Sequence, residues 1–164
     1  MIKNKGMTLF IAVSIMGVLL FISFAVVGIA IKGSLFATSG RDSQFAFYAA
    51  DAGLECALHW DSKYEPSKFA TSTAGTITCA GQTISTGTTI SGTSTVSRIG
   101  GGGSANPTSY FGFKLDQGLN QLQHCAIVSV TKNTNGTTYI KSRGYNTCDT
   151  SHPRRVERGI EVTY

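Results

Sequence analysis

The sequence predicts an α+β protein in which a long N-terminal helix, first transmembrane and then amphipathic, packs on a C-terminal antiparallel β-sheet. Three observations support this fold class. Residues 7–31 carry no charge, and 20 of these 25 residues are apolar. Residues 35–60 lack proline and keep a helical pattern, and the last third contains four runs rich in β-branched and aromatic residues. The 164 residues have room for one modest domain besides the N-terminal segment.

The uncharged stretch predicts a transmembrane helix over residues 7–32. A bilayer core about 30 Å thick needs roughly 20 apolar residues in a helix, so the stretch is long enough to span. A cleaved secretory signal, the alternative, has an apolar core of only about 7 to 15 residues and a small-x-small cleavage site. Lys3 and Lys5 precede the span, so we expect the basic end to stay cytoplasmic and the remainder to be exported.

The helix is expected to continue beyond the membrane as an amphipathic segment over residues 33–61. Asp51, Glu55 and His59 recur at intervals of four and form one polar stripe. The opposing apolar side needs a protein surface to pack on. It comprises Phe45, Tyr48, Ala49, Ala52 and Cys56, broadened by Phe47, Ala50, Leu54 and Leu58.

Two segments of this helix resemble a known family. The opening Lys3-Asn4-Lys5-Gly6-Met7-Thr8-Leu9, followed by the apolar run, resembles the class III signal of type IV pilins and pseudopilins. The stretch Phe47-Tyr48-Ala49-Ala50-Asp51-Ala52-Gly53-Leu54-Glu55 is similar to the end of the N-terminal helix in PilX-type minor pilins. The resemblance covers roughly residues 1–61. It implies a pilin-like lollipop fold and a structural and assembly role in a type IV pilus or related filament.

The resemblance also implies how the chain is processed. Residues 1–6 would be a leader peptide, which a prepilin peptidase removes between Gly6 and Met7 before it methylates the new amino group of Met7. Ile11 departs from the pattern, because major pilins carry glutamate at this fifth mature position. That carboxylate pairs with a neighbour's terminal amine, and an unpaired charge there would cost several kcal/mol. The departure is typical of minor subunits.

The implied partners are other pilins, the pilus assembly machinery, the prepilin peptidase and the membrane. The implied location is the cytoplasmic membrane, as a single-pass protein with an exported C-terminal domain, and afterwards an extracellular filament. A second hypothesis from another class is a single-pass anchored adhesion or binding protein that never enters a filament.

A connecting region rich in Thr, Ser and Gly is predicted over residues 62–109. These three residue types make up 24 of the 34 residues from 71 to 104, a bias typical of flexible linkers. Ile77, Ile84, Ile90 and Val96 interrupt the region at regular intervals, so short exposed strands are an equal alternative.

The antiparallel sheet is predicted over residues 110–164. Its four strands are expected at 110–115, 125–132, 138–143 and 156–164. Asn135-Gly136 lies between the second and third runs and is a strong hairpin signal, because both residue types tolerate positive φ.

All four cysteines lie on the side expected to be exported, where disulfides persist. Four cysteines allow three connectivities. The predicted hairpin brings Cys125 near Cys148, which leaves Cys56 with Cys79. A zinc site is the alternative, but the chain has no C-x-x-C pair.

The residues predict neither an enzyme nor a cofactor or metal site. The stripe of Asp51, Glu55 and His59 is most simply a solvated face, and no serine lies in a Gly-x-Ser-x-Gly motif. Nucleic acid is a further candidate partner, through a basic patch of Lys141, Arg143, Arg154, Arg155 and Arg158. The alternative is a solvated sheet face offset by Glu157 and Glu161.

Overall fold

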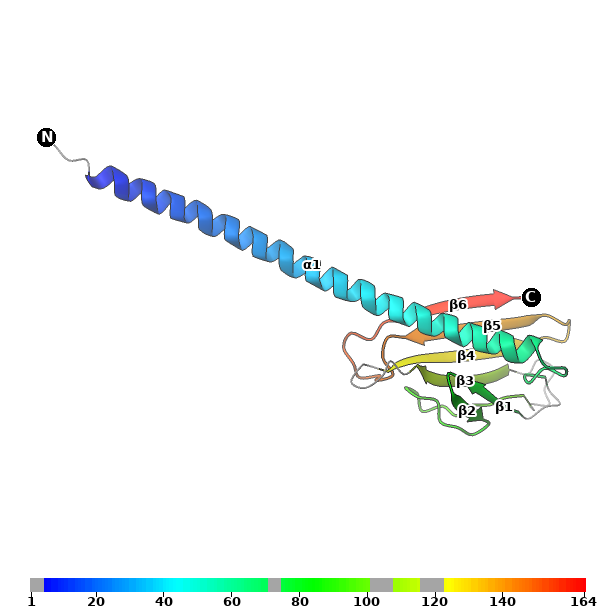
Figure 1. Ribbon diagram of the computed structural model, residues 1–164. Helices are drawn as coiled ribbons and strands as arrows, with labels where there is room; N and C mark the ends of the chain where they lie inside the picture. The colour runs from blue at the N-terminus through cyan, green and yellow to red at the C-terminus, as the bar shows by residue number, and fades with distance from the viewer. Residues whose placement is uncertain (1–4, 71–74, 101–107, 116–122) are drawn as a thin grey trace. The chain divides into compact units, whose positions relative to one another are not determined.

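The computed structural model describes residues 5–70, 75–100, 108–115 and 123–164 (Figure 1). Within them the chain forms one helix, α1 (Lys5–Ser62), and six strands. The strands are β1 (Thr76–Cys79), β2 (Gln82–Ser85), β3 (Thr108–Leu115), β4 (His124–Lys132), β5 (Thr138–Tyr145) and β6 (Glu157–Thr163). The chain divides into an N-terminal unit, residues 1–40, and a C-terminal unit, residues 41–164.

In the N-terminal unit the described residues are all helical. Glycines at 17, 28, 33 and 40 lie within this helix although glycine lowers helix stability by about 1 kcal/mol relative to alanine. A Cβ at any of the four would meet nothing within 4 Å, so packing inside this unit does not require them.

In the C-terminal unit an antiparallel sheet of order β3-β4-β5-β6 carries the last turns of α1 on one face (Figure 1). The four predicted runs match these four strands, with ends that differ by at most two residues. Each strand pairs with its neighbour in sequence, which is the simplest topology for strands joined by short connections. The α+β fold class, with a long N-terminal helix packed on an antiparallel sheet, is confirmed.

Small residues make the contact between α1 and the sheet. Gly53 of α1 lies against β4 and β5, where an added Cβ would approach Val128 Cγ2 to 2.9 Å and collide with Ser142 Oγ. Gly144 of β5 lies directly beneath the helix backbone, and the Ser142 hydroxyl donates a hydrogen bond of 2.6 Å to the Ala50 carbonyl. The helix face that is buried consists of Ala46, Ala49, Ala50, Leu54 and Ala57. Large side chains would hold the helix farther from the sheet.

This contact corrects the apolar face predicted for residues 33–61. Tyr48 is 64% exposed and Phe47 is 49% exposed, although both were placed on the packing side. The buried stripe instead runs through Ala46, Gly53 and Ala57. Because α1 and the sheet approach each other closely, no aromatic ring fits between them, and the rings of Phe47 and Tyr48 lie outside the contact.

The connecting region contributes to the core of the C-terminal unit. β1 and β2 form a hairpin whose turn residues Ala80 and Gly81 have φ of 48° and 73°, the positive values that a type I′ turn requires. Strands are therefore present here, but they are not simply exposed: Ile77, Ile84 and Ile90 are each at most 2% exposed. Of the four β-branched residues that interrupt this region, only Val96 has an exposed side chain, with an exposed fraction of 53%.

The β4–β5 hairpin forms where Asn135-Gly136 predicts it. Gly136 has φ of 88°, and Gly136 N–H donates to the Asn133 carbonyl while Asn133 N–H donates to the Thr137 carbonyl. The connection between β4 and β5 has five residues, 133–137, of which Gly136 alone has a positive φ, so Asn135 does not use the freedom predicted for it.

Candidate functional site

The most exposed apolar surface of the described chain belongs to the N-terminal unit. From Met7 to Ile31 every large apolar side chain is between 47% and 80% exposed, far more apolar surface than a water-soluble protein tolerates. The helix is long and apolar enough to cross a membrane. The Ser14 and Ser23 hydroxyls donate to the carbonyls four residues earlier, which satisfies these polar groups within the helix.

The predicted processing site lies at the start of α1. Gly6 and Met7 are both helical, whereas residues 1–4 of the predicted leader lie outside the described residues. Met7 is 66% exposed and Ile11, one turn later, is 47% exposed. Residues four apart lie on the same helix face, so the helix face that carries Met7, the predicted N-terminus after cleavage, presents an aliphatic side chain at Ile11 and no carboxylate there.

Two disulfides join the four cysteines in the predicted pairs. Cys56 of α1 bonds to Cys79 of β1, and Cys125 of β4 bonds to Cys148. The first ties the helix to the β1–β2 hairpin, and the second ties the sheet to the segment before β6. Each spans 23 residues of sequence. Disulfides are typical of oxidising, exported compartments.

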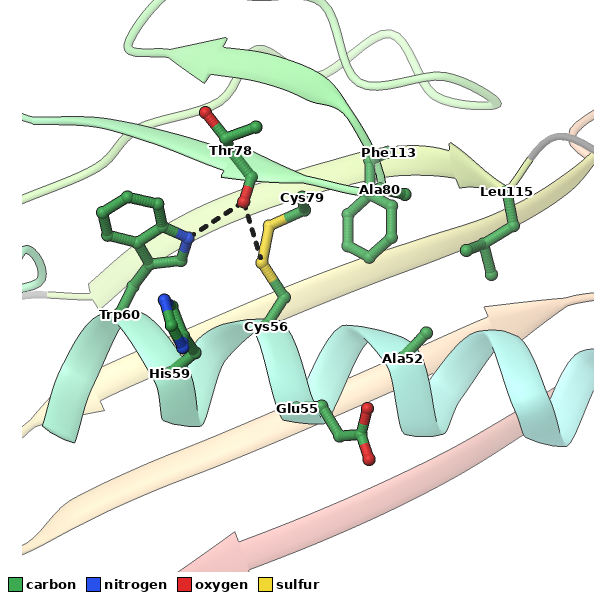
Figure 2. A pocket seen from close by; sticks show the side chains of 10 residues that line it. All are labelled: Ala52, Glu55, Cys56, His59, Trp60, Thr78, Cys79, Ala80, Phe113 and Leu115. Atoms are coloured by element: carbon green, nitrogen blue, oxygen red, sulfur yellow. Dashed lines mark hydrogen bonds between the residues drawn. A yellow bond between two sulfur atoms is a disulfide. The ribbon is translucent and has the colours of Figure 1, made fainter. Parts of the chain in front are cut away.

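A pocket of about 470 Å³ lies between α1, β1 and β3 beside the first disulfide (Figure 2). Phe113 and Leu115 line it together with the disulfide, and Glu55 and His59 lie on the helix at its border. The Trp60 indole N–H donates to the Thr78 carbonyl at 3.0 Å, which fixes the ring to the hairpin. The residues that line the pocket suit contact with an apolar group. The sulfurs of Cys56 and Cys79 are bonded to each other, so neither is a free thiol.

The polar stripe of α1 lies largely in solvent, as its simplest interpretation predicts. Glu55 and His59 are exposed and Asp51 is half-buried. Throughout the described ranges, no three His, Cys, Asp or Glu side chains are grouped to hold a metal ion.

A second pocket of about 430 Å³ adjoins the first along α1, since Ala52 and Leu115 line both. His124 lines it and stacks on Phe45 with ring centroids 4.6 Å apart. The imidazole Nδ1–H donates to the Asn146 carbonyl at 2.6 Å, and Nε2 is buried without a hydrogen-bond partner. Sequence reasoning missed this histidine, because its position at a strand end gives no sign of burial.

A polar cluster at the end of α1 was also missed. Asp61 accepts hydrogen bonds from Lys132 at 2.7 Å, Tyr164 at 2.6 Å and Ser67 at 2.5 Å. Burial raises the pKa of the Asp61 carboxyl, but these three hydrogen bonds outweigh burial and hold the pKa below its usual value. Burial is the largest of the causes that raise the pKa of the Tyr164 phenol, and the hydrogen bond to Asp61 raises it further. The cluster joins the helix end, β4 and the C-terminal residue.

The basic residues do not share one face. Alternation along paired strands places Lys141 and Arg143 on the face of the sheet away from α1, whereas Arg158 lies on the helix side and donates to the Ser43 hydroxyl at 2.8 Å. Lys141 forms a salt bridge of 2.5 Å with Glu161. Arg155 lies 3.9 Å from the centre of the Tyr145 ring. These contacts favour the alternative to a basic patch, namely a solvated sheet face whose positive charges are offset by Glu157 and Glu161.

Burial and a hydrogen bond to Glu157 raise the pKa of Tyr145 to about 12, so this phenol stays neutral under the stacked guanidinium.

No family model matches this chain, and no curated protein or solved structure matches it either. The pilin resemblance remains a prediction that depends on the residues quoted for it.

Proposed function

We propose that this protein is a minor pilin-like structural and assembly subunit of a type IV pilus or related filament. The observation that carries the proposal is the exposed, uncharged helical surface from Met7 to Ile31. It belongs to the same helix that ends in a folded, disulfide-bonded unit. Such a segment is stored in a membrane as a single span, and after extraction by an assembly machine it packs against the apolar helices of other pilins.

Ile11 suits the role of a minor subunit. The position carries an aliphatic side chain, so insertion between apolar helices requires no charge to be desolvated. It also provides no carboxylate for a neighbour's terminal amine, so the subunit lacks the pairing that repeats along a shaft.

Leader processing tests the proposal. The full chain is co-expressed with a prepilin peptidase, and the N-terminal peptide of the membrane fraction is identified by mass spectrometry. We expect it to begin at an N-methylated Met7. A Gly6→Val variant, which adds a branched side chain at the cleaved bond, should retain residues 1–6. A Gly17→Val variant is the matched control, because a Cβ at Gly17 meets nothing within 4 Å, and it should be cleaved like the parent.

The second candidate function is a single-pass anchored adhesion or binding protein. The two adjoining pockets beside α1 favour it, because concave, mostly apolar surfaces are where proteins bind ligands. Under this alternative the envelope protein retains Met1 to Gly6 even when the peptidase is active, and it is absent from sheared filaments.

A further inference from the structure

The tip of the β4–β5 hairpin carries a motif that the turn itself does not require. Asn135-Gly136-Thr137 is the only place in the chain where Asn is followed, after one residue other than proline, by Ser or Thr. This spacing is the acceptor motif for N-linked glycosylation, which places a bulky, hydrophilic glycan on the surface loops of exported proteins. The motif is short and occurs by chance in many chains, so its use as a site depends on how its side chains are placed.

The side chains of the tip are held in a fixed order of donors and acceptors. Thr137 donates two hydrogen bonds to Asn135 Oδ1, from its backbone N–H at 3.0 Å and from its hydroxyl at 2.7 Å. A backbone N–H can only donate, so the atom that it meets is the side-chain oxygen of Asn135 and not the nitrogen. The Thr137 hydroxyl accepts a hydrogen bond of 2.8 Å from Asn133 Nδ2. Asn135 Nδ2 is therefore the free end of its amide group.

The amide nitrogen of Asn135 has no structural task in the described part of the chain. It makes no hydrogen bond there, and residues 134–136 are all exposed. A Cβ added at Gly136 would meet nothing within 4 Å, so the space around the tip is open. The turn uses only the side-chain oxygen, which an aspartate would provide as well, and Gly136 supplies the positive φ. The hairpin thus explains an oxygen at position 135 but not the nitrogen.

The tip lies at the end of the C-terminal unit that is farther from Arg41, where this unit begins. Lys132, the last residue of β4, forms its salt bridge of 2.7 Å with Asp61 at the end of α1. From Arg41 to Asp61 the helix rises by about 30 Å. A glycan on the tip would extend from the end of the unit opposite to the point where the N-terminal unit joins it.

We propose that Asn135 is the acceptor of an N-linked glycan. The donor is a sugar joined through a diphosphate to a membrane polyprenol, and a transferase on the exported side supplies the catalytic base. Asn135 Nδ2 forms a bond to the anomeric carbon of the sugar while the bond from that carbon to the diphosphate oxygen breaks. The diphosphate leaves with the electron pair, and Nδ2 gives one of its two protons to the base. The product is still an amide, so Asn135 Oδ1 keeps its hydrogen bonds from Thr137.

The proposal rests on export of the C-terminal unit and not on assembly into a filament. The two disulfides of this unit are typical of an exported compartment. Both candidate functions described above place the unit there, so glycosylation is compatible with either of them.

Peptide mass spectrometry of the full chain, recovered from the envelope of the cells that make it, tests the proposal. Trypsin cleaves after Lys132 and Lys141 and releases residues 133–141, which include Asn133 outside the motif as an internal comparison. We expect most copies of this peptide to carry the mass of a glycan. Fragmentation by electron transfer, which leaves the glycan attached, should assign that mass to Asn135. An unmodified peptide, or a sugar on a threonine hydroxyl, would overturn the proposal.

Four variants produced in the same cells separate glycosylation from a role in the turn alone. Asn135→Asp keeps the oxygen of the turn but removes the nitrogen, and Thr137→Val removes the hydroxyl, so both should lose the added mass completely. Thr137→Ser keeps the hydroxyl and should keep the glycan. Asn133→Gln is the matched control, because it changes the neighbouring asparagine and leaves the motif intact, and it should be glycosylated like the parent.

Two further measurements on the same samples make the result specific. The mass of each variant before reduction shows whether both native disulfides have formed, so that loss of the glycan is not confused with misfolding. The N-terminal peptide reports leader processing, so failure of this proposal and failure of the proposed function are seen separately. A glycan that survives Thr137→Val, or that is lost in a correctly bonded Asn133→Gln variant, would contradict the assignment.

Discussion

The contact of α1 with the sheet predicts a severe effect of one added methyl group. In a Gly144→Ala variant the new Cβ would lie 2.8 Å from the Ala49 carbonyl carbon and would collide with Ala46 O and Ala50 N. Carbon atoms normally approach to about 3.5 to 4.0 Å, so the helix backbone has to move by roughly 1 Å. The φ of Gly144 is not positive, so the effect is steric alone.

The expected cost follows from two contributions. Overpacking of a core typically costs about 1 to 3 kcal/mol. Moving α1 away also weakens the buried hydrogen bond from Ser142 to Ala50, which is worth about 1 kcal/mol. We therefore expect a loss of about 3 kcal/mol, which corresponds to a fall in Tm of about 10 °C for a unit of this size.

Thermal unfolding of the full chain in detergent micelles, followed by near-ultraviolet circular dichroism, measures the effect. Gly159→Ala on the next strand is the matched control, because its Cβ makes only ordinary contacts, and its Tm should change by less than about 2 °C. If Gly144→Ala melts with the control, the close approach of helix and sheet is not a constraint on this fold.

Three further predictions concern the C-terminal unit. Asp61 has a pKa below its usual value in the folded state, so its stabilising contribution is present above about pH 4 and is lost as the pH falls through the folded pKa. Asp61→Asn should cost about 3 kcal/mol at pH 7 by leaving Lys132 without its anion, and should flatten the acid branch of urea midpoints measured from pH 3 to 7; an unchanged acid branch would contradict this. Replacing Cys56 and Cys79 together by alanine should lower the free energy of unfolding by about 3 kcal/mol in denaturant titration, and reductant should then have a smaller effect than on the parent. Gly136→Ala should cost about 1 kcal/mol in the same titration because its φ is 88°, and a neutral result would mean that the turn readily changes type.

Local patterns predicted the elements that depend on local physics. The four runs of β-branched and aromatic residues became β3 to β6, because a half-buried pleated strand selects these side chains over a short window. The disulfide pairs followed from the hairpin at Gly136, since the two strands bring Cys125 and Cys148 together. The N-terminal helix followed from an unbroken apolar run.

Contacts between residues distant in sequence could not be predicted this way. The buried face of α1 is set by Ser142 and Gly144, and the hydrogen bond from Ser142 reaches a residue 92 positions earlier. Asp61 finds partners 71 and 103 positions away. Ile77 and Ile84 are buried because a core formed by α1 and β3 is available to them, whereas Ile90 is buried in a second cluster with residues of β4 and β5; their spacing alone does not indicate either. The pockets beside α1 arise from the same long-range packing.

The decisive measurement for a role in filaments is the N-terminal peptide of protein recovered from sheared, purified filaments. If the protein is a minor pilin-like subunit, it should be present in the filaments and its first residue should be an N-methylated Met7. Protein found only in the membrane fraction, with Met1 to Gly6 still attached, would contradict it.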